Sequence, residues 1–243
     1  MGRMARHLSD LLSSCFPQPA HTRSGLVVPI HDRTERRIYE RMFVEDMFPL
    51  GCHAHLVSAA IPTVADIGAH VGMFALSVAD WFPQARMHLF EPVPRHAARA
   101  EALARLNGLS SLWQVHRAVV GDHHGEARLH CPSSDLGATL LEGKAGGMGG
   151  CRRTLDVPML RLDDYAAQNG LDCFDIIKID TEGCEYAAIA SARAVLAKAS
   201  LVFVRVFPPH STREGVDALL AKLGLKAVGR ADPGHHEHLW VRG

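Results

Sequence analysis

The segment Thr63–Glu91, TVADIGAHVGMFALSVADWFPQARMHLFE, contains the pattern that decides the fold. A short apolar run, Val64–Ile67, stops at Gly68, and Gly72 precedes a stretch with the composition of a buried helix. A further apolar run ends at Glu91. The order strand, glycine turn, helix and strand predicts the βα unit with which α/β proteins hold nucleotide-like ligands.

The spacing of the glycines indicates which ligand such a unit would hold. A dinucleotide fold has the pattern G-x-G-x-x-G, which lets a pyrophosphate approach the backbone. Here the pattern is D-x-G-x-x-x-G, with Asp66 before the first glycine and His70 in place of the middle one. An anionic side chain at this point repels phosphate and suits a cationic ligand. The turn therefore favours S-adenosylmethionine, which carries an ammonium, a sulfonium and no phosphate, over NAD; a flavodoxin-like turn without ligand is the remaining alternative.

The composition is that of an α/β chain with an ordinary core and no strong charge. The 243 residues are 47% hydrophobic, and Lys plus Arg equals Asp plus Glu at 26 each. Because no basic excess is present, we expect neither nucleic acid nor a membrane as a partner. No apolar run approaches the length of a membrane span.

The cysteines indicate a reducing compartment. None of the six forms a C-x-x-C pair, and a chain of this length and apolar content needs no disulfide framework. Residues 1–16 contain two arginines but no sustained apolar run of the kind that a secretory signal has. We therefore expect thiols and a cytoplasmic location.

The remaining periodicity predicts further strands and helices around the first unit. Extended segments are expected at Gly25–Ile30, Leu112–Val120, Glu126–Cys131, Thr154–Arg161, Leu201–Phe207, Lys226–Gly229 and Glu237–Val241, the last two as an antiparallel pair. Helices are expected at Leu8–Leu12, Arg33–Phe48, Cys52–Ala60, Arg95–Leu106, Glu185–Leu196 and Glu214–Leu223, with a short one capped by Asp163 and Asp164. The glycine-rich segment Ser133–Arg153 is long for a loop, which favours a functional lid over disorder.

A second informative stretch is Phe174–Glu185, FDIIKIDTEGCE. Its strand is apolar on both faces, as a central parallel strand should be. It is followed by Asp180 and Glu182, at the sheet edge where Asp66 and Glu91 are also expected. Lys178, within this buried strand, is expected to pair with an acid.

Three sequence blocks carry a family resemblance: DIGAHVG at Asp66–Gly72, FEP at Phe90–Pro92, and LDD at Leu162–Asp164 followed by IKIDTEGCE at Ile177–Glu185. Together they resemble the FkbM family of S-adenosylmethionine-dependent methyltransferases, and the stretch Ile38–Gly51 is similar to the segment that precedes the first block. The resemblance covers about residues 30–207, and K-I-D-x-E-G-x-E is its most specific part.

The resemblance implies a class I methyltransferase fold, a Rossmann-like three-layer α/β sandwich. Its mostly parallel seven-stranded sheet would include an antiparallel C-terminal strand. Residues 1–61 would form a small, partly helical N-terminal cap, and residues 62–243 the methyltransferase domain. The activity most often found in the family is O-methylation of a hydroxyl on a sugar or on a polyketide or peptide metabolite, as in secondary metabolite biosynthesis. The partner would be a small hydroxylated substrate, and a homodimer is one expected oligomeric state.

The resemblance also implies cofactor-binding residues. Glu91 would bind the ribose hydroxyls, Asp66 would act on the amino group directly or through water or an amide, and the backbone near Ala118 would touch adenine. The remaining residues of this set come from the glycine turn and the FEP block: Gly68, Ala69, His70, Gly72 and Pro92. Turn geometry alone, a loop cap and a solvated strand-end acid are the alternative interpretations for the glycines, Asp66 and Glu91 respectively. The family usually has Asn at the position of His70, so either the loop differs or His70 faces the ligand.

Asp180 and Glu182 are the candidate catalytic residues. Methyl transfer needs alignment of the acceptor with the sulfonium, and a hydroxyl acceptor must also lose its proton. Either acid would act as a base or hold a divalent cation such as Mg²⁺ that lowers the acceptor's pKa. A loop acid without a catalytic part is the alternative for each, and His210 is the alternative base.

Two other functions remain open. An NAD-linked Rossmann oxidoreductase is disfavoured by His70 in the glycine turn. A cofactor-binding scaffold without turnover is suggested by Arg205, because the family usually has an acid at that position.

Overall fold

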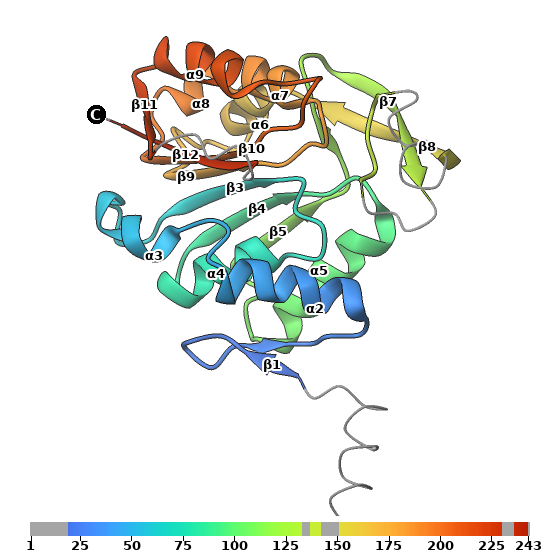
Figure 1. The fold of residues 1–243 in the computed structure, drawn as a ribbon, viewed down its shortest axis with the longest axis vertical. Helices are drawn as coiled ribbons and strands as arrows, with labels where there is room; N and C mark the ends of the chain where they lie inside the picture. The colour runs from blue at the N-terminus through green and yellow to red at the C-terminus, as the bar shows by residue number, and fades with distance from the viewer. Residues whose placement is uncertain (1–18, 133–136, 142–150, 230–235, 243) are drawn as a thin grey trace, which may run out of the picture.

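Two layers of helices enclose a central β-sheet in the computed structural model of the chain (Figure 1). The structure describes residues 19–132, 137–141, 151–229 and 236–242. Within these residues seven strands form the sheet in the order β11-β12-β10-β9-β3-β4-β5. In chain order these strands are β3 (Thr63–Ile67), β4 (Arg86–Phe90), β5 (Trp113–His116), β9 (Ile176–Ile179), β10 (Leu201–Arg205), β11 (Leu225–Val228) and β12 (Glu237–Arg242).

The directions of the strands confirm the predicted class I arrangement. Strands β10, β9, β3, β4 and β5 run parallel to their neighbours, whereas β12 runs antiparallel to both β10 and β11. All four residues of β9 are buried, as expected of a central parallel strand covered on both faces. The carboxyl ends of β3, β4, β9 and β10 therefore meet along one edge of the sheet.

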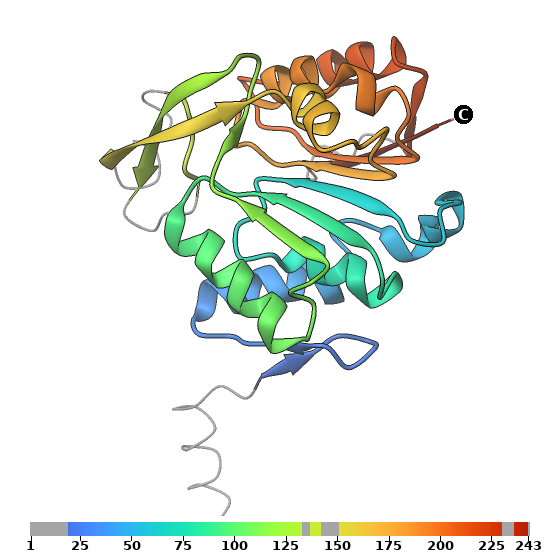
Figure 2. The same cartoon turned by 180° about the vertical axis from the view of Figure 1, so that it is seen from behind.

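Each face of the sheet has its own apolar core, because successive strand residues point to opposite sides. The helices of the two layers are α4 (Met73–Trp81) and α5 (Pro94–Leu106) on one side, and α6 (Leu162–Gln168), α7 (Glu185–Ser191), α8 (Arg193–Leu196) and α9 (Arg213–Ala221) on the other. On β3, Val64 packs into the core beneath α4 and α5, while Ala65 and Ile67 pack into the core beneath α6 to α9. Seen from behind, α5 lies along the β4–β5 side of the sheet (Figure 2).

A second, three-stranded sheet extends from the central one (Figure 1). It consists of β6 (Val119–Val120), β7 (Gly125–Pro132) and β8 (Cys151–Leu160). The two extended runs predicted at 126–131 and 154–161 are confirmed as the antiparallel pair β7 and β8. The single strand predicted over 112–120 was wrong, because the chain leaves the central sheet after His116 and Val119–Val120 pairs with β8 instead.

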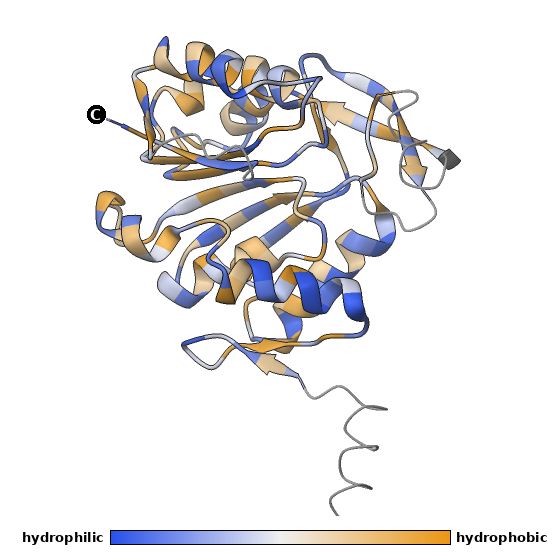
Figure 3. Cartoon of the chain, in the orientation of Figure 1, coloured by the Kyte–Doolittle hydropathy of each residue, from blue (hydrophilic) through white to orange (hydrophobic). Residues whose placement is uncertain are grey.

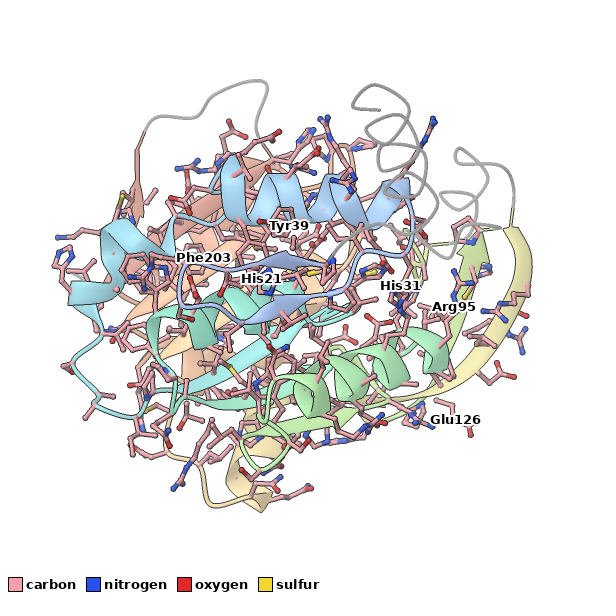
Figure 4. The ribbon with its side chains drawn as sticks, turned by 90° about the horizontal axis from the view of Figure 1, so that it is seen from below. His21, His31, Tyr39, Arg95, Glu126 and Phe203 are labelled. Atoms are coloured by element: carbon pink, nitrogen blue, oxygen red, sulfur yellow. The ribbon has the colours of Figure 1, made fainter. Side chains whose placement is uncertain are left out.

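The N-terminal segment packs on the α4–α5 side (Figures 1 and 4). It consists of β1 (Ala20–His21), β2 (Val27–Val28), α2 (Arg33–Tyr39), a π-helical turn η1 (Glu40–Val44), α3 (Leu50–His53) and a 3₁₀ turn η2 (Ala54–Leu56). The Tyr39 hydroxyl donates to the carbonyl of His21 across 3.2 Å, which joins α2 to the hairpin (Figure 4). The side chain of Asp80 on α4 accepts the backbone N–H of Ser24 at 2.7 Å and so joins the hairpin to α4.

Several predicted boundaries need correction. The helix predicted at 33–48 ends at Val44, because Asp46 adopts a positive φ of 51°. The helix predicted at 52–60 ends at Leu56, followed by extended Val57. Asp163 does not cap its own helix; its carboxylate accepts the N–H groups of Ala194 and Val195 and so caps α8. The helix predicted at 8–12 and most of the lid predicted at 133–153 lie outside the described residues.

The distribution of hydropathy agrees with this layering (Figure 3). Apolar residues fill the strands between the layers, and hydrophilic residues dominate α2. Among the helices that the structure describes, none combines the length and the apolar character that crossing a bilayer requires.

Candidate active site

A cavity of about 610 Å³ opens at the carboxyl ends of the parallel strands. This volume lies within the range of small-molecule sites, and the location is the one where open α/β sheets bind ligands. The predicted residues that line it are Gly68, Ala69, His70, Glu91, Pro92, Ala118, Asp180 and Glu182. The predicted residues Asp66, Gly72 and His210 do not belong to its wall.

Glu91 is held in a fixed orientation at the end of β4. One carboxylate oxygen accepts the backbone N–H of His70 at 2.7 Å, and the other accepts that of Val93 at 2.9 Å. The carboxylate is 5% exposed and lines the cavity. Each oxygen keeps a further lone pair, so the group can still accept hydrogen bonds from two neighbouring hydroxyls.

His70 takes part through its backbone as well as its ring. His70 has a φ of 51°, and the hydrogen bond that its backbone N–H donates to Glu91 helps to hold the turn in this conformation. The ring contacts that of His96, with 4.2 Å between centroids. Burial, with smaller contributions from His96 and Lys178, lowers the pKa of His70 to about 3, so the ring is neutral at pH 7.

Lys178 and Asp66 form a buried ion pair beneath the cavity. They are direct partners in the β9–β3 register, and 3.0 Å separates the ammonium from the carboxylate. Lys178 also donates to the carbonyl of Gly68 at 2.6 Å and lies 3.8 Å from Asp180. The predicted pairing of Lys178 with an acid is therefore seen. Asp66 is fully buried, so no direct contact with a ligand is available to it, and its effect on the cavity passes through Lys178.

The ionisation of this pair follows from its burial. Burial raises the pKa of Asp66 above its ordinary value, and the Lys178 ammonium opposes that rise only in part. Burial lowers the pKa of Lys178, but the Asp66 and Asp180 carboxylates overcome this effect and hold it above the usual range. The site thus keeps a positive charge between its acids at neutral pH.

The two glycines of the turn are required by protein packing. A Cβ on Gly68, whose φ is 76°, would lie 2.0 Å from the carbonyl oxygen of Asp180. A Cβ on Gly72, whose φ is 85°, would lie 3.0 Å from the Trp113 ring. Gly72 therefore lets Trp113 of β5 approach the start of α4.

The two candidate catalytic acids, Asp180 and Glu182, follow the carboxyl end of β9 and also line the cavity. The Arg205 guanidinium lies 3.7 Å from both Asp180 and Glu182, and its Nε lies 3.1 Å from Glu237. Glu182 has a positive φ of 54°, and its carbonyl accepts the Thr139 hydroxyl at 2.9 Å. One oxygen of Asp180 is buried without a hydrogen-bond partner among the described residues.

His210 is not brought to this site. The turn after β10 is closed by Ser211, whose hydroxyl donates to the buried carboxylate of Glu185 and whose N–H donates to the Phe207 carbonyl. This arrangement leaves His210 exposed on the surface. The expectation of an alternative base at this position therefore has no geometric support.

Sequence reasoning missed Glu237 and Arg41. Glu237 is opposite Arg205 in the β10–β12 register and pairs with Arg41 of η1 at 2.5 Å. The available signal was the acid at the start of the predicted C-terminal strand, but the register of that strand could not be read from the sequence.

Within the described residues, no three His, Cys, Asp or Glu side chains are grouped to hold a metal ion. Asp180 and Glu182 therefore have no third side chain of this kind beside them among the described residues.

A mostly parallel sheet with one reversed strand, a glycine turn and an anchored strand-end acid are the arrangement of the class I methyltransferase fold. The sequence specifies the class further. Residues 66–238 match the family described as the methyltransferase FkbM domain, and the chain belongs to this family.

The names of similar proteins are consistent with this family assignment. The chain is 25% identical over 225 residues to the 2-O-methyltransferase NoeI of Sinorhizobium fredii, covering 84% of this chain and 88% of that protein. It is 28% identical over 202 residues to the 31-O-demethyl-FK506 methyltransferase FkbM of Streptomyces tacrolimicus, covering 70% and 75%. A crystal structure of methyltransferase FkbM from Methylobacillus flagellatus KT matches with a TM-score of 0.55 and 14% identity, over 75% of this chain and 44% of that one. The structural match supports the fold alone.

Proposed function

We propose that this enzyme methylates a hydroxyl group of a small-molecule metabolite, with S-adenosylmethionine as the methyl donor. The observation that carries the proposal is that one cavity joins the anchored Glu91 on one wall to Asp180 and Glu182 on another. The names of two relatives, which describe O-methyltransferases, support hydroxyl oxygen as the acceptor atom.

The residues of the cavity fit the cofactor. Glu91 presents two oriented oxygens to a pair of ribose hydroxyls. Asp180 lines the cavity with its side chain partly exposed, and its carboxylate suits an ammonium group. Ala118 and Val119 give an apolar wall for adenine. When bound, the cofactor supplies an electrophilic methyl group on sulfur.

The chain's own contribution is alignment and proton removal. We assign Glu182 as the base that accepts the proton of the acceptor hydroxyl as the oxygen attacks. Its loop is fixed by Glu185, whose carboxylate accepts the Thr181 hydroxyl at 3.0 Å and the Gly183 N–H at 2.8 Å. The Arg205 guanidinium, shared among Glu182 and two other acids, limits the repulsion between these carboxylates.

The test is a methyl-transfer screen over hydroxylated small molecules with wild-type enzyme, Glu182→Gln and the surface control Glu214→Gln. We expect transfer to a hydroxyl by wild type and control, and a fall of about 100-fold or more for Glu182→Gln at unchanged S-adenosylhomocysteine affinity. A Glu182→Gln rate within about threefold of wild type would remove the base assignment.

Measurements of NAD binding and of transfer to amines, made on the same samples, separate the other functions. NAD binding without S-adenosylhomocysteine binding would indicate an oxidoreductase. Cofactor binding without transfer to any acceptor class would indicate a scaffold. Transfer to amines but not to hydroxyls would replace the O-methyltransferase proposal, and runs with and without Mg²⁺ test metal dependence.

A further inference from the structure

Helix α2 presents a row of arginines to the cavity. Arg33, Arg37 and Arg41 follow one another at four-residue intervals, which places them on one face of the helix and of its η1 continuation. All three line the cavity that contains Glu91 and Asp180. Figure 3 shows this helix as a strongly hydrophilic element.

Two of these arginines have no countercharge in the part of the chain that the structure describes. Arg41 pairs with Glu237. The one acid within α2, Glu35, points the other way: it is buried, accepts the His31 N–H at 2.8 Å and pairs with Arg99 of α5. Among the described residues, no carboxylate lies within ion-pair distance of Arg33 or Arg37.

The other main cations of the cavity wall are compensated. Lys178 is neutralised by Asp66 from beneath. Arg205 is surrounded by the carboxylates of Asp180, Glu182 and Glu237. The uncompensated positive charge of the described wall is therefore concentrated on the α2 side.

We propose that the methyl acceptor carries an anionic group, such as a carboxylate, phosphate or sulfate ester, and that Arg33 and Arg37 bind it. This inference rests on the proposed methyl transfer to a small molecule. Guanidinium groups form two-pronged hydrogen bonds with such anions. Residues four apart on a helix are separated by about 6 Å along the axis, so two arginines can hold one anionic group between them. The acceptor would be anchored by this group while its hydroxyl faces Glu182.

A carboxylate could also come from the amino-acid end of the cofactor, so the test must distinguish the two sources. The double variant Arg33→Gln/Arg37→Gln removes both charges. Arg36→Gln is the matched control, because Arg36 lies in the same helix, is exposed and does not line the cavity. S-Adenosylhomocysteine is compared with 5′-methylthioadenosine, which lacks the amino-acid carboxylate.

Binding to the S-adenosylhomocysteine complex is measured by ligand-observed NMR for matched pairs: glucose with glucose 6-phosphate, and 4-hydroxybenzyl alcohol with 4-hydroxybenzoate. In wild type and Arg36→Gln we expect the anionic member of at least one pair to bind about tenfold or more tighter than the neutral one. In the double variant this preference should fall below about threefold, while S-adenosylhomocysteine affinity changes by less than about twofold. High salt should weaken the preference in wild type.

Three results would overturn the inference: equal binding of neutral and anionic members, no binding of any anionic member, or a preference that survives in the double variant. A fourth is a loss of S-adenosylhomocysteine affinity in the double variant with 5′-methylthioadenosine unaffected, which would assign the arginines to the cofactor's carboxylate. These binding results do not depend on turnover. Anion preference without methyl transfer would therefore refute the proposed function alone, and methyl transfer only to neutral alcohols would refute this inference alone.

Discussion

Replacing Lys178 with methionine should destabilise the protein strongly, because it leaves Asp66 buried without its counterion. The side chains are 4% and 0% exposed, and their charged groups are 3.0 Å apart. Methionine fills a similar volume, so the cost arises from charge and hydrogen bonding rather than from a cavity. The variant also loses the 2.6 Å hydrogen bond that Lys178 donates to the carbonyl of Gly68.

The expected loss is about 3–5 kcal/mol, the usual cost of removing one partner from a buried ion pair. For a chain of this size, each kcal/mol lowers the melting temperature by roughly 2–4 °C, so a fall of about 6–20 °C is expected. The double variant Asp66→Asn/Lys178→Met removes the orphaned charge and should recover more than about half of this loss.

The pH dependence provides a second signature. Burial already raises the pKa of Asp66, and without the ammonium the rise should be larger. A group whose pKa is higher in the folded than in the unfolded state contributes stability at pH values below its unfolded-state pKa. This stability is lost as the pH rises through its folded-state pKa. The deficit of Lys178→Met should therefore shrink as pH falls from about 7 toward 5. Urea denaturation followed by circular dichroism measures both effects. A cost below about 1 kcal/mol, or a double variant no more stable than the single one, would refute the reasoning.

Three further predictions concern the glycine turn, the ring of His70 and the loop that follows β9. Gly68→Ala should lower the free energy of unfolding by roughly 1–3 kcal/mol more than Gly108→Ala, as measured by urea denaturation. Both glycines have a positive φ, but only a Cβ at Gly68 would meet the Asp180 carbonyl. Equal losses in the two variants would contradict this prediction. Calorimetric affinity for S-adenosylhomocysteine should vary by less than about twofold between pH 5.5 and 8, because the pKa of His70 is lowered to about 3 and its ring stays neutral over this range. A pH-dependent affinity in wild type that is absent in His70→Asn would contradict this prediction. Glu185→Leu, which removes the acceptor of both the Thr181 hydroxyl and the Gly183 N–H, should lower methyl transfer by about tenfold or more at unchanged cofactor affinity, because the loop after β9 loses its anchor; an unchanged rate would exclude that role.

Local sequence patterns predicted the sheet because its central strands are encoded by short-range signals. The run IIKI of β9 is apolar on both faces except for Lys178, so burial on both sides of the sheet follows from its composition. The pairing of Lys178 with an acid followed from placing a charge in such a strand. The boundaries were less predictable: the single strand expected over 112–120 divides between two sheets, and nothing local marks that division.

The part of the cavity around Gly68 and Glu91 was predictable, and the part around Arg205 and α2 was not. Gly68 and Glu91 belong to one contiguous segment, so their proximity follows from a single βα unit. Glu237 reaches Arg205 only through the register of the reversed strand β12. Arg33 and Arg37 reach the cavity because Glu35 pairs with Arg99 and fixes the rotation of α2. Such contacts depend on tertiary packing between distant segments.

The central claim is that the anchored carboxylate of Glu91 holds the ribose of an adenosyl cofactor in this cavity. Titration calorimetry with S-adenosylhomocysteine tests it most directly, using wild type, Glu91→Ala and the control Glu101→Ala from the outer face of α5. We predict saturable one-to-one binding by wild type and control. For Glu91→Ala, the loss of hydrogen bonds to a charged acceptor, about 2 kcal/mol or more, predicts at least about 30-fold weaker binding. Absence of binding to wild type, or equal affinities of Glu91→Ala and Glu101→Ala, would contradict the account.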